Sequence, residues 1–395
     1  LQKTGLIAFL LINMFLWYYL TLNTISLVSK NVGFDQSDLF SLYSLGVIIG
    51  GAIGLPFSKK RHNIMLLWIS LGSAMSFLPL SISVLTQQCF QLICLAWGFS
   101  LGLGMPSCLS FFAENTEVEK RGRLSGVVLL LALFCATPLG SLVSSLGLAI
   151  LYFFLGFWRM LGLIPLLAFR IKREKLEFTK SHEGYEVPIL RRLYLYLIPW
   201  FIFNIVDGLE GLLLRNFVKA AFPDQFALLQ FIGLVLLGVF AFFGGFACDL
   251  LGRKVVTILG FVIMGIAYAI ISMAPASLTA WFSFYVCNSF SWGWFTTVLV
   301  MVIWGDLAPK RYIEKYYFVG TFPYFLTAII QRLSAGYVVL LTETNAFSLA
   351  ALFLFIAVLP ILFAPETLPE KAIRERELRG YIEKAKRVRE KFTKG

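Results

Sequence analysis

Long apolar runs alternate with short polar stretches along the whole chain. Each run holds about 20 residues, the length an α-helix needs to cross the hydrocarbon core of a bilayer. None shows the short alternating segments of a transmembrane barrel. The pattern predicts twelve spanning helices, near residues 4–28, 38–57, 63–84, 88–113, 123–143, 146–169, 193–217, 226–248, 254–274, 278–303, 314–340 and 344–364.

The longest polar connection, residues 170–192, divides the predicted spans six and six. We therefore expect an all-α integral membrane protein with twelve transmembrane helices in two pseudo-symmetric six-helix bundles. The expected parts are an N-terminal bundle over 1–169, a cytoplasmic linker over 170–192, a C-terminal bundle over 193–366 and a basic cytoplasmic tail over 367–395.

The two halves repeat one another in their polar connections. SKK (58–60) follows the second span and GRK (252–254) follows the eighth; ENTEVEKRGRLSG (114–126) follows the fourth and DLAPKRYIEKYYFVG (306–320) follows the tenth. Many transporters are built from such duplicated halves and hold their substrate near the bilayer midplane between them. The repeat therefore favours transport over a single packed bundle.

Composition and charge agree with a multi-pass membrane protein. Hydrophobic residues make up 58% of the chain and charged residues only 14%, with a net charge of +12. The Lys and Arg residues gather in one set of loops and in the tail, which predicts that those loops and both termini are cytoplasmic. The positive charge thus reflects topology, and we expect no nucleic-acid partner.

One loop carries a recognisable signature. Gly245, Asp249, Gly252, Arg253 and Lys254 have the spacing G-x-x-x-D-x-x-G-R-K, which resembles the loop signature of the major facilitator superfamily in its second-half copy. The first-half copy is degraded, with Leu55 and Ser58 where an acid and a glycine are expected. The segment 98–123, with Glu114, Arg121 and Gly122, resembles the fourth-helix region of the same superfamily, and PETLPEK (365–371) resembles the end of the twelfth helix in sugar-porter-like members.

The resemblance implies a function for these charges. In superfamily members such a cluster holds the cytoplasmic side shut in one state and breaks when that side opens. It implies this role for Asp249 and Arg253, and the degraded first copy suggests that one half carries most of it. The other interpretation is a positive-inside anchor with a capping acid.

Several charged residues fall inside predicted spans, where their insertion cost makes them functional candidates. Asp207 and Glu210 share one face of the seventh span with Asn204 nearby, and Arg332 in the eleventh span is a candidate partner for either acid. Two interpretations remain open. The charges form a salt bridge that fixes helix packing, or one carboxylate holds a proton or a cationic group.

Helices one, four, seven and ten line the central cavity in the superfamily fold. The resemblance therefore favours two stripes as cavity lining: Asn13, Trp17, Thr21 and Thr24 in the first span, and Tyr285, Asn288, Trp292 and Thr296 in the tenth. Packing or interface belts are the alternative. We expect Arg159, in the sixth span, to lie outside the cavity and to snorkel or find a structural partner.

The sequence predicts a secondary active transporter that moves a small organic solute by alternating access, with Asp207 and Glu210 as candidates for proton coupling. A facilitative sugar-like uniporter, a lipid flippase and a non-transporting receptor of the same fold are alternatives. The first span has no acid between Lys3 and Asp35, which disfavours sugar–proton symport. We expect no enzyme activity, metal or cofactor, a small-molecule substrate, contacts with membrane lipids, and a monomer in the plasma membrane.

Overall fold

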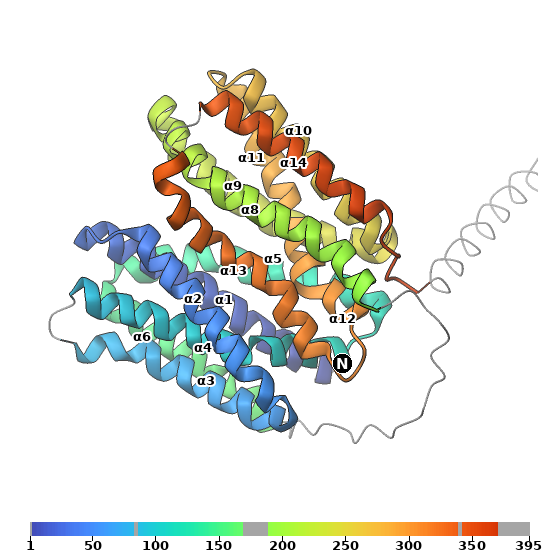
Figure 1. The fold of residues 1–395 in the computed structure, drawn as a ribbon. Helices are drawn as coiled ribbons and strands as arrows, with labels where there is room; N and C mark the ends of the chain where they lie inside the picture. The colour runs from blue at the N-terminus through green and yellow to red at the C-terminus, as the bar shows by residue number, and fades with distance from the viewer. Residues whose placement is uncertain (1, 83–85, 169–188, 339–341, 370–395) are drawn as a thin grey trace, which may run out of the picture.

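The computed structural model of the chain describes residues 2–82, 86–168, 189–338 and 342–369, and all regular elements in these ranges are helical (Figure 1). Most of the predicted linker, and the tail beyond residue 369, lie outside the described residues.

The first half forms six spans that match the predicted ones to within a few residues. They are α1 (Gln2–Val32), α2 (Gln36–Gly54), α3 (Arg61–Phe77), α4 (Gln87–Glu114), α5 (Arg121–Ser145), and α6 (Leu148–Leu161), which continues into α7 (Leu163–Ala168).

The second half repeats this plan. Its helices are α8 (Ile189–Ala221), α9 (Pro223–Leu250), α10 (Arg253–Met273), α11 (Leu278–Phe295), α12 (Ile303–Leu307), α13 (Ile313–Val338) and α14 (Glu343–Leu362). A π-helical segment, η4 (Thr296–Val302), joins α11 to α12, so these three form one span. Eleven described segments are long and apolar enough to cross a membrane, and the more polar α13 adds the twelfth.

The two halves form two bundles that meet along their lengths (Figure 1). Across the interface α2 packs against α13, and α5 packs against α9. The chain is a multi-pass membrane protein with two six-helix bundles, as the sequence predicts. We call the end that holds the 252–254 loop the inner end, and the end where α2 begins the outer end.

Close helix contacts inside the N-terminal bundle depend on small residues. A β-carbon at Gly50 of α2 would lie 2.2 Å from the Phe99 carbonyl oxygen, and one at Gly98 of α4 would lie 1.9 Å from the Tyr43 carbonyl oxygen. In lipid, where the hydrophobic effect does not drive helices together, close backbone packing of this kind supplies much of the attraction. The glycines therefore fix α2 against α4, and with it the wall of the interface between bundles.

Candidate functional site

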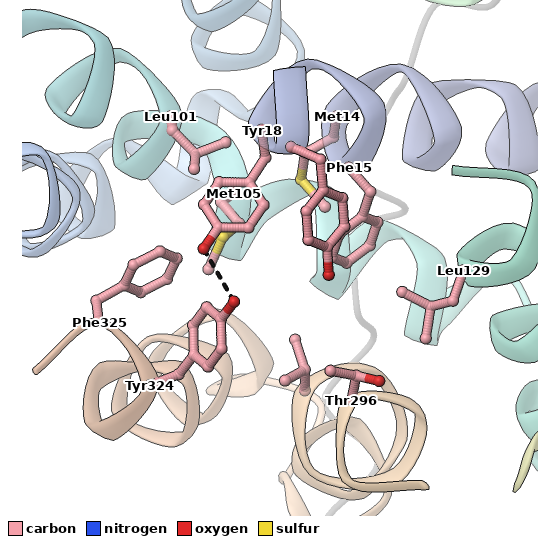
Figure 2. A pocket seen from close by; sticks show the side chains of 11 residues that line it. Met14, Phe15, Tyr18, Leu101, Met105, Leu129, Thr296, Tyr324 and Phe325 are labelled. Atoms are coloured by element: carbon pink, nitrogen blue, oxygen red, sulfur yellow. Dashed lines mark hydrogen bonds between the residues drawn. The ribbon is translucent and has the colours of Figure 1, made fainter. Parts of the chain in front are cut away.

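A small cavity lies between the two bundles near the middle of the molecule (Figure 2). Its volume is about 30 Å³, which is room for a few water molecules at most. The lining residues come from both halves: Met14, Phe15, Tyr18, Tyr19, Leu101, Met105 and Leu129 from the first, and Thr296, Val300, Tyr324 and Phe325 from the second. The centre of the protein is therefore closed and mostly apolar in this conformation.

Two tyrosines join the bundles across this cavity. The hydroxyls of Tyr18 on α1 and Tyr324 on α13 are 2.9 Å apart and share a hydrogen bond, which Figure 2 shows as a dashed line. The Tyr18 ring also meets Phe325 edge-on, with centroids 6.1 Å apart. Edge-on aromatic pairs are favourable and can be exchanged for contacts with an aromatic or apolar ligand. The pair thus joins the two bundles at the cavity and contributes two of the hydroxyl groups that line it.

The predicted polar stripe of α1 does not line this cavity. Asn13 and Trp17 are fully buried inside the N-terminal bundle. The Asn13 amide donates to the Trp158 carbonyl (2.6 Å), and the Trp17 indole donates to Ser76 Oγ (3.0 Å). Each residue advances about 100° around a helix, so the cavity is met by the adjoining face of α1. The helical spacing of the stripe is correct, but its assignment to the cavity is wrong.

The intramembrane acids lie on α8 in the C-terminal bundle. Asp207 is partly buried within hydrogen-bonding reach of the Trp292 indole. The Trp292 ring in turn meets Tyr324 of the cavity edge-on, with centroids 5.9 Å apart. Glu210 is buried, and its Oε2 has no hydrogen-bond partner. Aromatic contact thus links Asp207 to the cavity, although neither acid lines it directly.

Asn204 and Asn288 occupy different surroundings. Asn204 Nδ2 donates to the Trp200 carbonyl (2.6 Å), and its Oδ1 accepts a hydrogen bond from Thr327 Oγ1 (3.0 Å), which ties α8 to α13. Asn288 on α11 is partly buried and lies outside the cavity lining. Asn204 is thus part of the helix packing that positions Asp207.

Arg332 does not pair with the α8 acids, so that expectation is wrong. Its guanidinium Nε donates instead to the Asp38 carboxylate at the start of α2. The sequence pattern did not show which neighbour the outer part of α13 meets, and that neighbour is α2 of the other bundle. Arg332 therefore closes the outer end by joining the bundles.

Asp249 makes the central contact of the inner end. Its carboxylate accepts hydrogen bonds from the backbone amides of Gly122 (3.0 Å) and Arg123 (2.9 Å) in the first turn of α5, in the other bundle. A carboxylate at this position satisfies free helix amides and meets the positive end of the helix dipole. The acid of the predicted signature thus binds the opposite bundle through the backbone.

Arg253 extends this contact within the second half. Its guanidinium lies 3.3 Å from Asp249 and 3.1 Å from Asp306, and Arg121 of the first half also binds Asp306. Glu366 accepts hydrogen bonds from the backbone amides of Arg253 (2.8 Å) and Lys254 (3.1 Å). The buried charges therefore form a continuous network in which each cation meets an acid.

Two glycines of the signature have separate roles. Gly252 has φ of +98°, a left-handed conformation that favours glycine at the turn between α9 and α10. A β-carbon at Gly245 would lie 2.4 Å from the Gly122 carbonyl oxygen of α5. Gly245 thus permits contact between the bundles, while Gly252 makes the tight turn.

The first half makes a matching contact despite its degraded signature. Arg61, at the start of α3, is buried and binds Glu114 of α4 (2.6 Å) and Glu314 of α13 (2.8 Å). Since Glu314 belongs to the other bundle, this contact also crosses the interface. The first half therefore also contributes a buried charged contact to the inner end, although Leu55 stands where the signature has an acid.

The chain is similar to known proteins in its three-dimensional structure and not in a way that sequence comparison detects. No family model matches the sequence, and no curated protein matches it. The solved structure of the proton:xylose symporter XylE bound to 6-bromo-6-deoxy-D-glucose is similar at TM-score 0.68 and 15% identity, over 92% of this chain and 96% of that one. The chain has the major facilitator superfamily fold.

Two further solved structures are similar to this chain at TM-scores on either side of that value. The human organic anion transporter MFSD10 (TETRAN) matches at TM-score 0.71 and 14% identity, over 91% of this chain and 98% of that one. A bacterial homologue of the iron transporter ferroportin, in an outward-facing state, matches at TM-score 0.63 and 14% identity, over 90% and 97%.

The sequence did not identify four residues that make charged contacts at the inner end. They are Arg61, Asp306, Glu314 and Glu366. Asp306 lies in the repeated segment 306–320, and Glu366 lies in PETLPEK (365–371). An acidic residue in either segment could therefore have been recognised from the sequence as a partner for the basic residues of the inner end. Arg61 and Glu314 lie far apart in sequence, and only the packing of α4 and the turn at residues 55–60 against α13 brings them together.

Proposed function

We propose that the chain is a secondary transporter that moves an amphipathic organic solute by alternating access between its two bundles. The observation that carries this proposal is the cavity between the bundles, with bundle-to-bundle contacts on both sides of it. Asp249 and Arg61 join the bundles at the inner end, and Arg332 joins them at the outer end. Breaking one set while keeping the other would expose the cavity to one side of the membrane at a time.

The lining supports a substrate with an apolar or aromatic body. Met, Phe, Leu, Val and Tyr side chains surround the cavity, and its polar groups are the hydroxyls of Tyr18, Tyr19, Thr296 and Tyr324. A sugar needs a denser set of hydrogen-bonding groups, because each unpaired hydroxyl is costly to bury. Asp207 and Glu210 nearby favour a cationic group on the solute over an anionic one.

The similar solved structures are of a proton:xylose symporter, an organic anion transporter and a bacterial homologue of an iron transporter. For this chain an anionic solute lacks support, because the buried Arg159 and the outer-end Arg332 are both absent from the cavity lining. An apolar cavity also supports a lipid-like solute.

We propose a monomer in the plasma membrane with both termini cytoplasmic. Labelling of single cysteines in the loops would test this orientation.

The proposal is tested by flux in proteoliposomes. We expect uptake of labelled lipophilic organic cations driven by a pH gradient, and no uptake by empty liposomes. Movement of headgroup-labelled lipid instead would identify a flippase, and uptake of neutral sugars a sugar-like uniporter. Absence of flux for all three classes from a folded protein would contradict transport and favour a receptor.

Substitution of the intramembrane acid tests coupling. We expect Asp207→Asn to abolish transport or to remove its dependence on the pH gradient, because the amide cannot take up a proton. Asp224→Asn, at an exposed acid at the start of α9, makes the same chemical change and should transport normally. Full and equally pH-dependent transport by folded Asp207→Asn would rule out this role.

A further inference from the structure

Arg159, in the middle of the sixth span, is a cation with none of its surface exposed. The prediction that it snorkels is wrong, and the prediction of a structural partner is confirmed, because its Nη1 donates to Asn13 Oδ1 (2.9 Å). Two tryptophan rings also pack on the guanidinium. Its central carbon, Arg159 Cζ, lies 4.0 Å from the ring centroid of Trp68 and 5.1 Å from that of Trp17.

These contacts leave the positive charge without a counter-charge. Among the residues that the structure describes, no carboxylate forms an ion pair with Arg159. Cation–π contacts and one amide oxygen attract a cation, but they carry no net negative charge. A buried ion is strongly disfavoured unless it is paired, and the membrane interior makes this cost larger. The N-terminal bundle therefore carries an unbalanced charge at its centre.

Hydrogen-bonding groups beside this charge are also unused. Arg159 Nε and Nη2 have no hydrogen-bond partner, and neither has the buried hydroxyl of Ser100 on α4. Both groups face Gly72 of α3, because a β-carbon at Gly72 would lie 2.9 Å from Ser100 Oγ and 3.0 Å from Arg159 Nε. Donors from two helices thus converge where the third helix has no side chain.

We propose that Arg159, Ser100 and Gly72 form a binding site for a small monovalent inorganic anion, with chloride as the natural probe. The anion accepts hydrogen bonds from the guanidinium and the hydroxyl and neutralises the buried charge. The space beside Gly72 is tight, because even one carbon atom there would lie 2.9–3.0 Å from the two donors, so the ligand has one or a few atoms and the donors shift slightly to admit it. The site is separate from the cavity between the bundles, so it stabilises the N-terminal bundle and does not take the transported solute.

Thermal unfolding of the purified full-length protein tests the site. Melting temperature Tm would be measured in sodium gluconate and in increasing sodium chloride or bromide at constant ionic strength. An anion that binds only the folded state raises Tm with its concentration, and we expect a rise of about 2 °C or more. Equal Tm values in gluconate, chloride and bromide would overturn the proposal.

Variants assign the effect to the site. Arg159→Met removes the charge but keeps a long side chain against the tryptophans, and its Tm should not respond to chloride. Arg215→Gln removes one positive charge at an exposed position of α8 and should respond as the native protein does. A native response in Arg159→Met would show that chloride acts elsewhere and would overturn the proposal.

Two milder variants keep the test decisive if Arg159→Met fails to fold. Ser100→Ala removes one donor and should shift the chloride response to several-fold higher concentration. Gly72→Ala places a methyl group between the donors and should abolish the response while Arg159 keeps its charge. An unchanged response in both would contradict the site.

Discussion

Arg61 and Arg253 each form ion pairs with two acidic residues at the inner end, although the sequences around them differ. Arg253 lies within an acid-and-glycine signature and binds acids of its own half, Asp249 and Asp306. Arg61 has no such signature, yet it joins Glu114 of its own half to Glu314 of the other. At the residue scale the bundles are therefore held by a balanced set of buried charges, in which losing one member leaves another unpaired.

We expect Arg61→Gln to destabilise the conformation that is closed at the inner end by about 3 kcal/mol, because removing one partner strands two carboxylates. Its Tm should fall, and cysteines placed at the inner end of the interface should react faster with a polar maleimide.

Lys120→Gln is the matched control, since the Lys120 side chain is 70% exposed and that of its partner Glu117 is 65% exposed. Adding Glu314→Gln to Arg61→Gln should recover part of the loss, because it removes one stranded charge. Unchanged labelling in Arg61→Gln would show that this contact does not hold the inner end.

At the element scale, the crossing of α5 and α9 brings backbone from the two bundles into direct contact. A β-carbon at Gly122 would lie 2.2 Å from Cys248 Sγ and 2.6 Å from the Gly245 carbonyl oxygen. This spacing leaves no room for a side chain. The same approach lets Asp249 reach the first amides of α5.

We therefore expect Gly122→Ala to force α5 and α9 apart, at a cost of about 1–3 kcal/mol for overpacking. The population should shift toward conformations open at the inner end, measured as faster labelling of a cysteine placed there. Gly336→Ala on α13 is the control, because a β-carbon at Gly336 meets nothing within 4 Å. Equal labelling of the two variants would refute a role for this crossing.

The helices were predictable because membrane insertion requires an unbroken apolar length. The face that each helix turns to its neighbours was less predictable. For α1 the polar stripe suggested a wet cavity, whereas Asn13 and Trp17 satisfy partners inside the bundle. Arg332 was likewise assigned to the wrong partner. Such pairings depend on packing between distant segments, which periodicity within one helix does not encode.

At the scale of the whole molecule, both ends of the interface are closed, but by different means. Inner-end contacts are buried, whereas the Asp38–Arg332 pair at the outer end leaves the arginine side chain 44% exposed. Solvent and salt weaken an exposed pair far more than a buried one. The outer end should therefore open more readily than the inner end.

We expect Arg332→Glu to favour opening at the outer end a few-fold, because two acids would then face each other. Labelling of a cysteine introduced among the cavity residues, with reagent added from outside, would report the change. The charge swap Asp38→Arg with Arg332→Glu should restore slow labelling, and high salt should reduce the difference between native and single variant. Failure of the swap to restore closure would point to a cause other than charge.

The π-helical segment η4 links the two regions described above. Thr296 and Val300 of η4 line the cavity, and the same span continues through α12 to Asp306, which binds Arg121 and Arg253. A π segment holds an extra residue in its turn and is found frequently at functional sites. Tightening η4 to ordinary α-helical winding, at about 100° per residue, would turn the helix beyond it, so we expect a change of winding beside the cavity to shift Asp306 relative to Arg121 and Arg253.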